Sequence, residues 1–137
     1  MVDQTDQRII QELTKNGRMT MKELGEKVHL TGQAASSRVL RLEEEGIIEG
    51  YSIKVNKRKT GYSVHCFLNI YTRNIHHQPY LSFLETEEEH VINNYKISGD
   101  GCYLLECHFP SNEELDKFLV QLNAHVNYKL SIVINRT

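Results

Sequence analysis

The chain has 137 residues, of which 25% are charged and 39% hydrophobic, a composition typical of a folded globular protein and unlike that of a disordered chain. No apolar run approaches the roughly 20 residues that a membrane-spanning helix needs, and the N-terminus lacks the basic and apolar segments of a secretory signal. Three cysteines are too few, and odd in number, for a disulfide scaffold. We therefore expect a cytoplasmic protein.

The two halves of the chain differ in charge. Residues 1–61 hold eleven Lys and Arg against nine Asp and Glu, a net charge of +2, whereas residues 62–137 hold five against nine, a net charge of −4. The acidic half repels a polyanion, so any contact with nucleic acid is expected in the N-terminal half.

The first 45 residues have the apolar spacing of three short helices. The first starts near the cap-type residues Asp3 and Asp6 and ends at residues 16–17, the second starts at Thr20, and the third covers about residues 32–45. Only three residues, 29–31, separate the second helix from the third. This is the form of a helix-turn-helix, whose second helix enters the major groove of DNA.

The outer face of the third helix carries side chains suited to DNA. Arginine binds guanine with two hydrogen bonds, glutamine binds adenine, and serine bonds bases or phosphates. A plain helical hairpin with a polar outer face, which docks a protein partner, is the alternative interpretation. The candidate residues on this face are Gln33, Ser36, Ser37, Arg38 and Arg41.

The segment after the third helix has a different period. Residues 47–55 alternate between apolar and polar around Gly50, which predicts a short β-hairpin. Such a hairpin is the wing of a winged helix-turn-helix, and it would bring Tyr51 and Lys54 near the DNA backbone. Residues 56–61 have no apolar side chain and are predicted to form a solvated linker. We therefore place the boundary between a DNA-binding domain of residues 1–61 and a second domain of residues 62–137.

The second domain alternates strands and helices. Strands are predicted at residues 64–71, 91–97, 102–109 and 126–134, with helices at 80–84 and 111–122. The order βαββαβ is that of a ferredoxin-like domain, so the whole chain is of the α+β class. The first strand is apolar on both faces, and two helices cover only one face of a sheet. The other face is therefore expected to lie against a second copy of the chain.

Three stretches carry a resemblance to a known family: DQTDQRIIQEL, GRMTMKELGEKVHLTGQAASSRVLRLEEEGIIEGY and ISGDGCYLLECHF. They resemble the Lrp/AsnC (feast/famine) transcriptional regulators, in the same order and over about residues 3–135. The resemblance implies a sequence-specific DNA-binding regulator with a recognition helix and wing between Ser37 and Tyr51. It also implies homodimers formed through the sheet, higher homo-oligomers such as octamers, and a small amino acid bound between dimers.

Two features depart from the family pattern. Where the family's turn reads Gly-x-x-Asp-Tyr, with an Asp that holds the amino group of the ligand, this sequence has Gly99, Asp100, Gly101, Cys102 and Tyr103. Cys102 thus stands where the family has Asp. The sequence also ends at Thr137, straight after the fourth predicted strand, whereas many members continue into a tail that contributes to higher assembly.

The same turn is the candidate effector site. Its glycines leave backbone N–H groups unobstructed, a geometry suited to a ligand carboxylate, and Asp100 is the nearest anion for an ammonium group. The alternative is that the glycines merely permit a tight hairpin and Asp100 faces solvent. No pattern of a nucleophile, phosphate loop or metal-ligand set occurs, so we expect no enzymatic activity, no metal and no cofactor.

Overall fold

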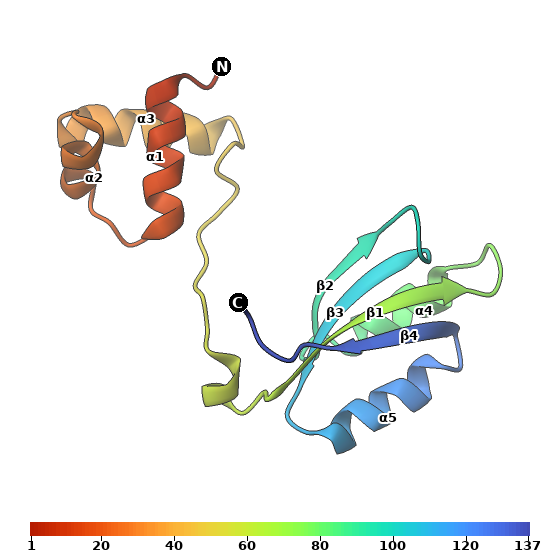
Figure 1. The fold of residues 1–137 in the computed structure, drawn as a ribbon. Helices are drawn as coiled ribbons and strands as arrows, with labels where there is room; N and C mark the ends of the chain where they lie inside the picture. Colours follow the sequence, from red (N-terminus) through yellow and green to blue (C-terminus); the bar gives the residue numbers. More distant parts are fainter. The chain divides into compact units, whose positions relative to one another are not determined.

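The computed structural model describes all 137 residues, and they form two compact units, residues 1–55 and residues 56–137. In Figure 1 the helices of the first unit come before an extended segment, and the sheet of the second unit follows it. No helix is both long enough and apolar enough to cross a membrane.

The first unit contains three helices: α1 (Gln4–Lys15), α2 (Met21–Val28) and α3 (Gly32–Glu44). The predicted starts are confirmed, because Asp3, Thr20 and Thr31 each accept a hydrogen bond from the backbone N–H three residues on. Asp3 and Asp6 also form a reciprocal capping box. The three helices bury one shared core: Ile9, Leu13, Met19, Leu24, Val28, Ala35, Val39 and Leu42.

The predicted β-hairpin of residues 47–55 is wrong, because these residues contain no strand. The backbone N–H groups of Ile47 and Ile48 both donate to the Leu42 carbonyl, so these two residues end α3 instead of starting a strand. Gly46 supplies the positive φ of 73° for this ending. A lone two-stranded hairpin is also marginal in water. Residues 49–55 are extended, and none of their backbone groups has a backbone hydrogen-bond partner.

The second unit begins at residue 56, six residues before the start predicted from the sequence. Residues expected as a solvated linker form a 3₁₀ turn, η1 (Lys57–Thr60), capped by the Asn56 side chain. The strands and helices that follow are β1 (Val64–Thr72), α4 (Gln78–Glu85), β2 (Val91–Lys96), β3 (Tyr103–Phe109), α5 (Asn112–Leu122) and β4 (Val126–Ile132).

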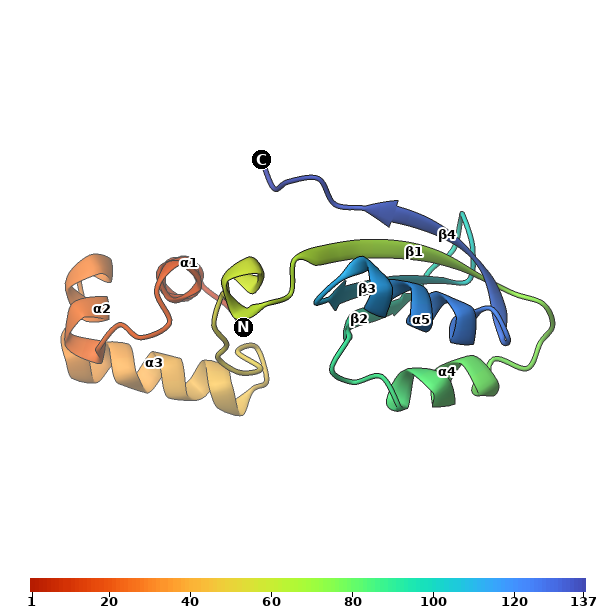
Figure 2. The same cartoon turned by 90° about the horizontal axis from the view of Figure 1, so that it is seen from below.

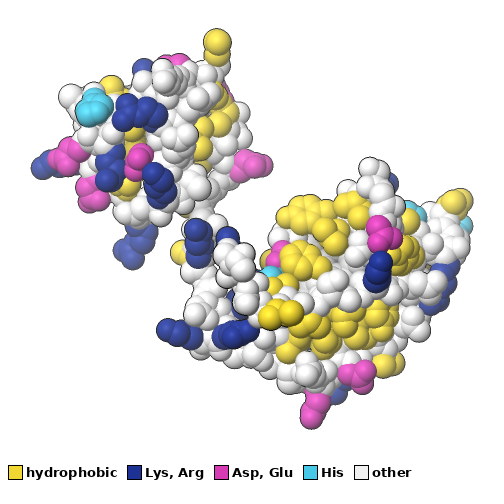
Figure 3. Space-filling model, viewed as in Figure 1, with side chains coloured by type: hydrophobic (Ala, Val, Ile, Leu, Met, Phe, Trp, Pro, Cys, Tyr) yellow, Lys and Arg dark blue, Asp and Glu magenta, His cyan; other side chains and the backbone are white.

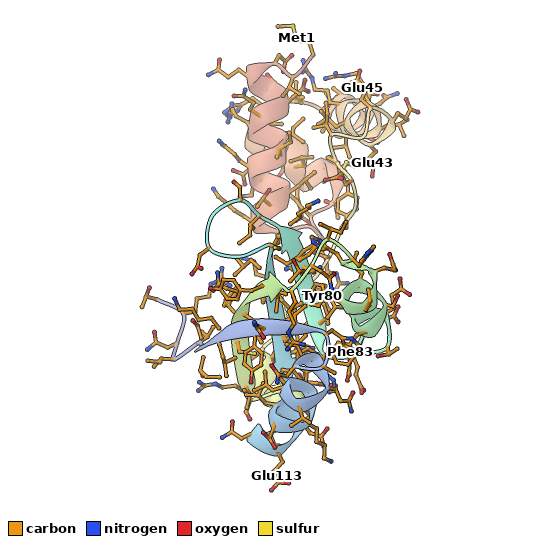
Figure 4. All side chains as sticks on the ribbon, turned by 90° about the vertical axis from the view of Figure 1, so that its right-hand side faces the viewer. Met1, Glu43, Glu45, Tyr80, Phe83 and Glu113 are labelled. Atoms are coloured by element: carbon orange, nitrogen blue, oxygen red, sulfur yellow. The ribbon has the colours of Figure 1, made fainter.

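The four strands form one antiparallel sheet in the order β2-β3-β1-β4, which is the predicted ferredoxin-like arrangement. Both helices lie on the same face of the sheet (Figure 2). Alternate residues of β1 and β3 face these helices and are buried, and Tyr80 and Phe83 project from α4 into the same core (Figure 4). The opposite face, which we call the outer face, has no helix over it.

Candidate nucleic-acid interface and effector site

Close packing fixes the angle between α2 and α3. A Cβ atom at Gly25 of α2 would lie 2.5 Å from the Leu30 carbonyl oxygen, so only glycine allows the turn to approach the helix. His29 ends α2 in the left-handed conformation, with a φ of 60°. Thr31 then caps α3. The sequence therefore forms the compact helix-turn-helix that was predicted, and α3 is packed closely against the turn and α2.

The exposed stripe of α3 carries three polar side chains. Gln33, Ser36 and Ser37 all lie on the surface and share one helical face with Leu40. Leu40 is 54% exposed although it is apolar. The hydroxyl and amide groups of this face can form hydrogen bonds with base edges, and its apolar side chain can contact a thymine methyl group.

The two arginines of α3 are placed differently. Arg38 donates to both carboxylate oxygens of Asp3, at 2.9 and 2.7 Å, and to Asp6 at 3.1 Å. Arg41 donates to Asp6, to the Met1 carbonyl and to Glu45. These bonds tie α3 to the start of α1. The interpretation of Arg38 and Arg41 as DNA contacts stays a prediction, and the structure gives both side chains partners within the first unit.

Asp6 is the centre of this cluster and is fully buried. Burial raises the pKa of its carboxyl group, but the backbone N–H of Asp3 and the guanidinium groups of Arg41 and Arg38 outweigh burial and lower the pKa to about 2. The charged carboxylate is therefore satisfied by three donors, as a buried charge requires. We refer to Asp3, Asp6, Arg38 and Arg41 as the α1–α3 ion cluster.

The two predicted wing residues lie on the extended segment after α3. The Tyr51 hydroxyl donates to Glu43 at 3.0 Å, and Glu43 lies near the C-terminal end of α3 in Figure 4. Lys54 is exposed and makes no ion pair. Residues 47–54 and the second half of α1 line a groove of about 840 Å³. Lys54 is thus free to contact a phosphate, while Tyr51 is tied to α3.

The turn predicted as an effector site is shaped by its glycines. Gly99 and Gly101 have φ values of 128° and 103°, and a Cβ atom at Gly101 would lie 2.7 Å from the Ile70 carbonyl oxygen. Two of the N–H groups expected to be free are already used, because Cys102 donates to Ile70 and Gly101 donates to Gly99. The turn therefore packs against the end of β1 and offers fewer donors than the sequence suggested.

Asp100 and Cys102 have different partners. Asp100 accepts from the Tyr71 hydroxyl at 2.6 Å and lies 3.5 Å from the Lys129 ammonium. The Tyr71 hydroxyl lowers the pKa of Asp100 below its ordinary value. Tyr71 and Lys129 belong to the rows of β1 and β4 that alternate with the buried residues. Asp100 is therefore paired with side chains of the outer face.

Cys102 belongs to a polar chain at the end of the sheet. Its Sγ atom lies 3.2 Å from the Thr72 hydroxyl, which lies 3.2 Å from Nε2 of His77. The other ring nitrogen of His77 is 3.0 Å from the Tyr103 hydroxyl. The Thr72 hydroxyl lowers the pKa of the Cys102 thiol, whereas burial raises the pKa of Cys66 to about 11. The structure thus joins Cys102 and Tyr103 through two residues that the sequence did not single out.

Comparison with known proteins decides the family. A winged helix-turn-helix DNA-binding model matches residues 2–49, and the Lrp/AsnC ligand binding domain model matches residues 65–137. The chain belongs to the Lrp/AsnC family. The Bacillus subtilis transcriptional regulator LrpA is 64% identical over 136 residues, which cover 99% of this chain and 100% of LrpA. LrpB of the same organism is 39% identical, covering 97% of this chain and 89% of LrpB.

Solved structures of this family have the same fold. The structure of B. subtilis LrpC superimposes with a TM-score of 0.93 at 29% identity, covering 100% of this chain and 97% of that one. A feast or famine regulatory protein from Mycobacterium tuberculosis, complexed with L-methionine, has a TM-score of 0.89 at 28% identity, covering 99% of this chain and 94% of that one. The Lrp/AsnC protein described here is thus a DNA-binding transcriptional regulator with a helix-turn-helix unit and a ferredoxin-like domain.

Reasoning from the sequence missed two groups of residues at the candidate sites. The burial of Asp6 could have been predicted, because Asp6, Ile9 and Leu13 have the i, i+3, i+7 spacing of one helical face. No sequence pattern predicts that Thr72 and His77 lie near Cys102. Their positions depend on the register of β1 against β3 and on the loop before α4.

Proposed function

We propose that α3 reads an operator through Gln33, Ser36 and Ser37, and that the α1–α3 ion cluster holds α3 in the orientation it needs. The exposure of these three polar side chains on one stripe of a capped, rigid helix carries the proposal. Lys54, unpaired on the extended segment, adds a phosphate contact. As the ligand is chromosomal DNA, we place the protein in the cytoplasm.

Replacing Gln33 by alanine is expected to weaken operator binding by about 1–3 kcal/mol and to relax the preference for one base pair, as loss of a base-reading side chain does. Fluorescence anisotropy with an operator selected from random DNA, and with all single substitutions of it, measures both effects. Gln11→Ala is the matched control, because Gln11 is exposed on α1. Equal affinity and equal base preference in Gln33→Ala and Gln11→Ala would contradict the placement of the reader stripe.

We infer that the outer face of the sheet is buried against a second copy of the chain. Hydrophobic side chains gather over the sheet in the view of Figure 3. By the register of the strands, this face carries Phe67, Tyr71, Tyr95 and Leu104, with Tyr95 54% exposed. An apolar patch of this kind on a soluble chain marks an interface, and a two-fold dimer supplies two readers for a near-palindromic site.

The unpaired segment of residues 49–55 supports the same assembly. Its backbone groups have no backbone hydrogen-bond partners, and Ile53 is 81% exposed, so it is an extended segment that is open to pairing with a strand of another chain. Antiparallel pairing with its own copy about Ile53 would place Tyr51 opposite Val55 of the second chain. We propose that a two-stranded ribbon of this kind forms in the dimer and takes the place of the hairpin that the single chain lacks.

We also propose that a small amino acid binds at the turn of residues 98–101 and modulates DNA binding. The M. tuberculosis relative complexed with L-methionine supports a small amino acid as the ligand. The ammonium of such a ligand needs a nearby anion or several acceptors. The chain of Cys102, Thr72 and His77 supplies acceptors but no carboxylate, while Asp100 is paired with Tyr71 and Lys129.

The variant Cys102→Asp is expected to bind its amino acid at least ten-fold more tightly, because it places a carboxylate where the family has one. Calorimetric titration of the wild type and the variant with the twenty amino acids tests this. Cys66→Asp is unsuitable as a control because Cys66 is fully buried. The control is Cys102→Asn, because asparagine has the shape of aspartate without its charge. Unchanged affinity in Cys102→Asp for every amino acid would contradict the proposed site.

A further inference from the structure

The loop between α4 and β2 contains a histidine held between two carboxylates. His90 follows Glu87 and Glu89, and each of the three residues places a metal-ligating atom within 4.8 Å of the other two. β2 starts directly after His90, whereas the turn of residues 98–101 follows its other end. This cluster therefore lies at the opposite end of β2 from the candidate effector site.

The ring of His90 is fixed in one orientation. Nδ1 lies 2.9 Å from a carboxylate oxygen of Glu87, and because a carboxylate only accepts, Nδ1 carries the proton. The ring stacks on Phe109 with a centroid distance of 4.8 Å, and the His90 carbonyl accepts from the backbone N–H of His108 on β3. The side chains of His90 and Glu87 are only 11% and 16% exposed.

The other ring nitrogen of His90 is free. With the proton on Nδ1, Nε2 is the ring nitrogen that presents a lone pair, and it makes no hydrogen bond within the chain. The nearest acidic group is the Glu89 carboxylate, 3.8 Å away. Glu89 is 71% exposed, while its backbone carbonyl is held by the His108 ring at 2.9 Å. An oriented lone pair thus faces an exposed carboxylate at the surface.

We propose that this cluster is a binding site for a divalent transition-metal ion of the zinc class, with His90 Nε2 and Glu89 as ligands and Glu87 as the group that orients the histidine. A carboxylate on the far ring nitrogen is the usual support of a metal-ligating histidine. Zinc holds histidine nitrogen and carboxylate oxygen at about 2.0–2.2 Å, so its two donors lie about 3.3 Å apart at a tetrahedral angle. A small rotation of the exposed Glu89 side chain reaches this spacing, and water completes the coordination.

The nitrogen donor selects among metal ions. Imidazole suits zinc and its transition-metal neighbours, whereas Mg²⁺ and Ca²⁺ prefer all-oxygen sites. We therefore expect Zn²⁺ to bind in the presence of excess Mg²⁺. The proposed metal site needs neither DNA nor an amino acid. A finding that Zn²⁺ does not bind would therefore leave the proposed regulatory function unaffected.

Calorimetric titration of the full-length protein with ZnCl₂ alone, in a buffer free of phosphate, tests the site. We expect one Zn²⁺ per chain and an affinity at least ten-fold lower in Glu89→Gln. Glu88→Gln is the matched control, because Glu88 is an exposed neighbour outside the cluster, and its affinity should equal that of the wild type. Glu87→Gln should lose about ten-fold, as loss of an orienting group does.

Six other histidines in the chain make a second readout necessary. Nitrogen NMR of the histidine rings should show Zn²⁺ shifting Nε2 of His90 before any other ring nitrogen. No binding, equal affinity in the wild type and Glu89→Gln, or a first shift at another histidine would each overturn the proposal.

Discussion

Replacing Asp6 by alanine is expected to lower the free energy of unfolding of the first unit by about 2–3 kcal/mol. The substitution removes the buried acceptor of three hydrogen bonds and leaves Arg38 and Arg41 without their central partner. The two arginine side chains are about one third exposed, so water can solvate their guanidinium groups after the substitution. The loss of unfolding free energy therefore stays below the largest values known for broken buried ion pairs. Hydrogen exchange of the core amides of α1 and α3 measures the change.

Glu12→Ala is the matched control for this measurement. Glu12 lies on the same helix, and its ion pair with Lys15 has an N–O distance of 3.8 Å and an exposed lysine. Such a pair contributes little, so the exchange rates should stay near those of the wild type. Equal exchange rates in Asp6→Ala and Glu12→Ala would show that the α1–α3 ion cluster does not stabilise the unit.

The lowered pKa of Asp6 predicts that the stability of the first unit depends on pH. Because the folded pKa of Asp6, about 2, lies below its ordinary value of 3.8, its stabilising contribution is complete above about pH 4 and is lost as the pH falls toward 2. Urea unfolding followed by circular dichroism at pH 5 and pH 2.5 should show a larger loss of stability in the wild type than in Asp6→Asn. A loss of the same size in both proteins would exclude Asp6 as the titrating group.

Replacing Phe67 by aspartate is expected to raise the dissociation constant of the dimer by at least 100-fold. Phe67 lies in the central strand β1, opposite Glu106 of β3 and Ser131 of β4 on the outer face. In a dimer formed through this face, the new carboxylate is buried without a partner near the existing carboxylate of Glu106, which already accepts from Asn93 and lies 2.6 Å from His65.

Sedimentation equilibrium over a range of protein concentrations measures the dissociation constant. Val120→Asp is the control, because Val120 is 67% exposed on α5, on the helical side of the sheet. We expect a dimer for the wild type and Val120→Asp and a monomer for Phe67→Asp at micromolar concentration. A wild-type monomer, or an undiminished dimer of Phe67→Asp, would contradict assembly through the outer face.

The features that the sequence predicted correctly are those set by neighbouring residues. The caps at Asp3, Thr20 and Thr31 each depend on a side chain and an N–H group three residues away. The order of strands and helices in the second unit follows from the change of hydrophobic period. The prediction of a hairpin at residues 47–55 was wrong for a physical reason. The alternation of apolar and polar residues indicates an extended chain, but the single chain provides no second strand to pair with it.

The parts of the sites that were missed depend on contacts between distant residues. Arg38 and Asp6 are 32 positions apart, and the helical face of Arg38 alone does not distinguish a DNA contact from a bond to α1. Asp100 and Cys102 are two positions apart, yet one pairs with Tyr71 and Lys129 and the other with Thr72. Their separation follows from the packing of Gly101 on β1, which the spacing of the motif does not reveal.

We propose that α3 reads DNA through sequence-specific contacts. The most direct measurement is the salt dependence of binding to a selected operator and to random DNA, for the wild type and for a variant with Gln33, Ser36 and Ser37 all replaced by alanine. We expect the wild type to prefer its operator, and both proteins to lose affinity for DNA steeply as salt rises. The variant should bind operator and random DNA equally. A wild type that binds no DNA, as a protein whose helices only dock a protein partner would, or a triple variant that keeps the full preference for the operator, would contradict the account.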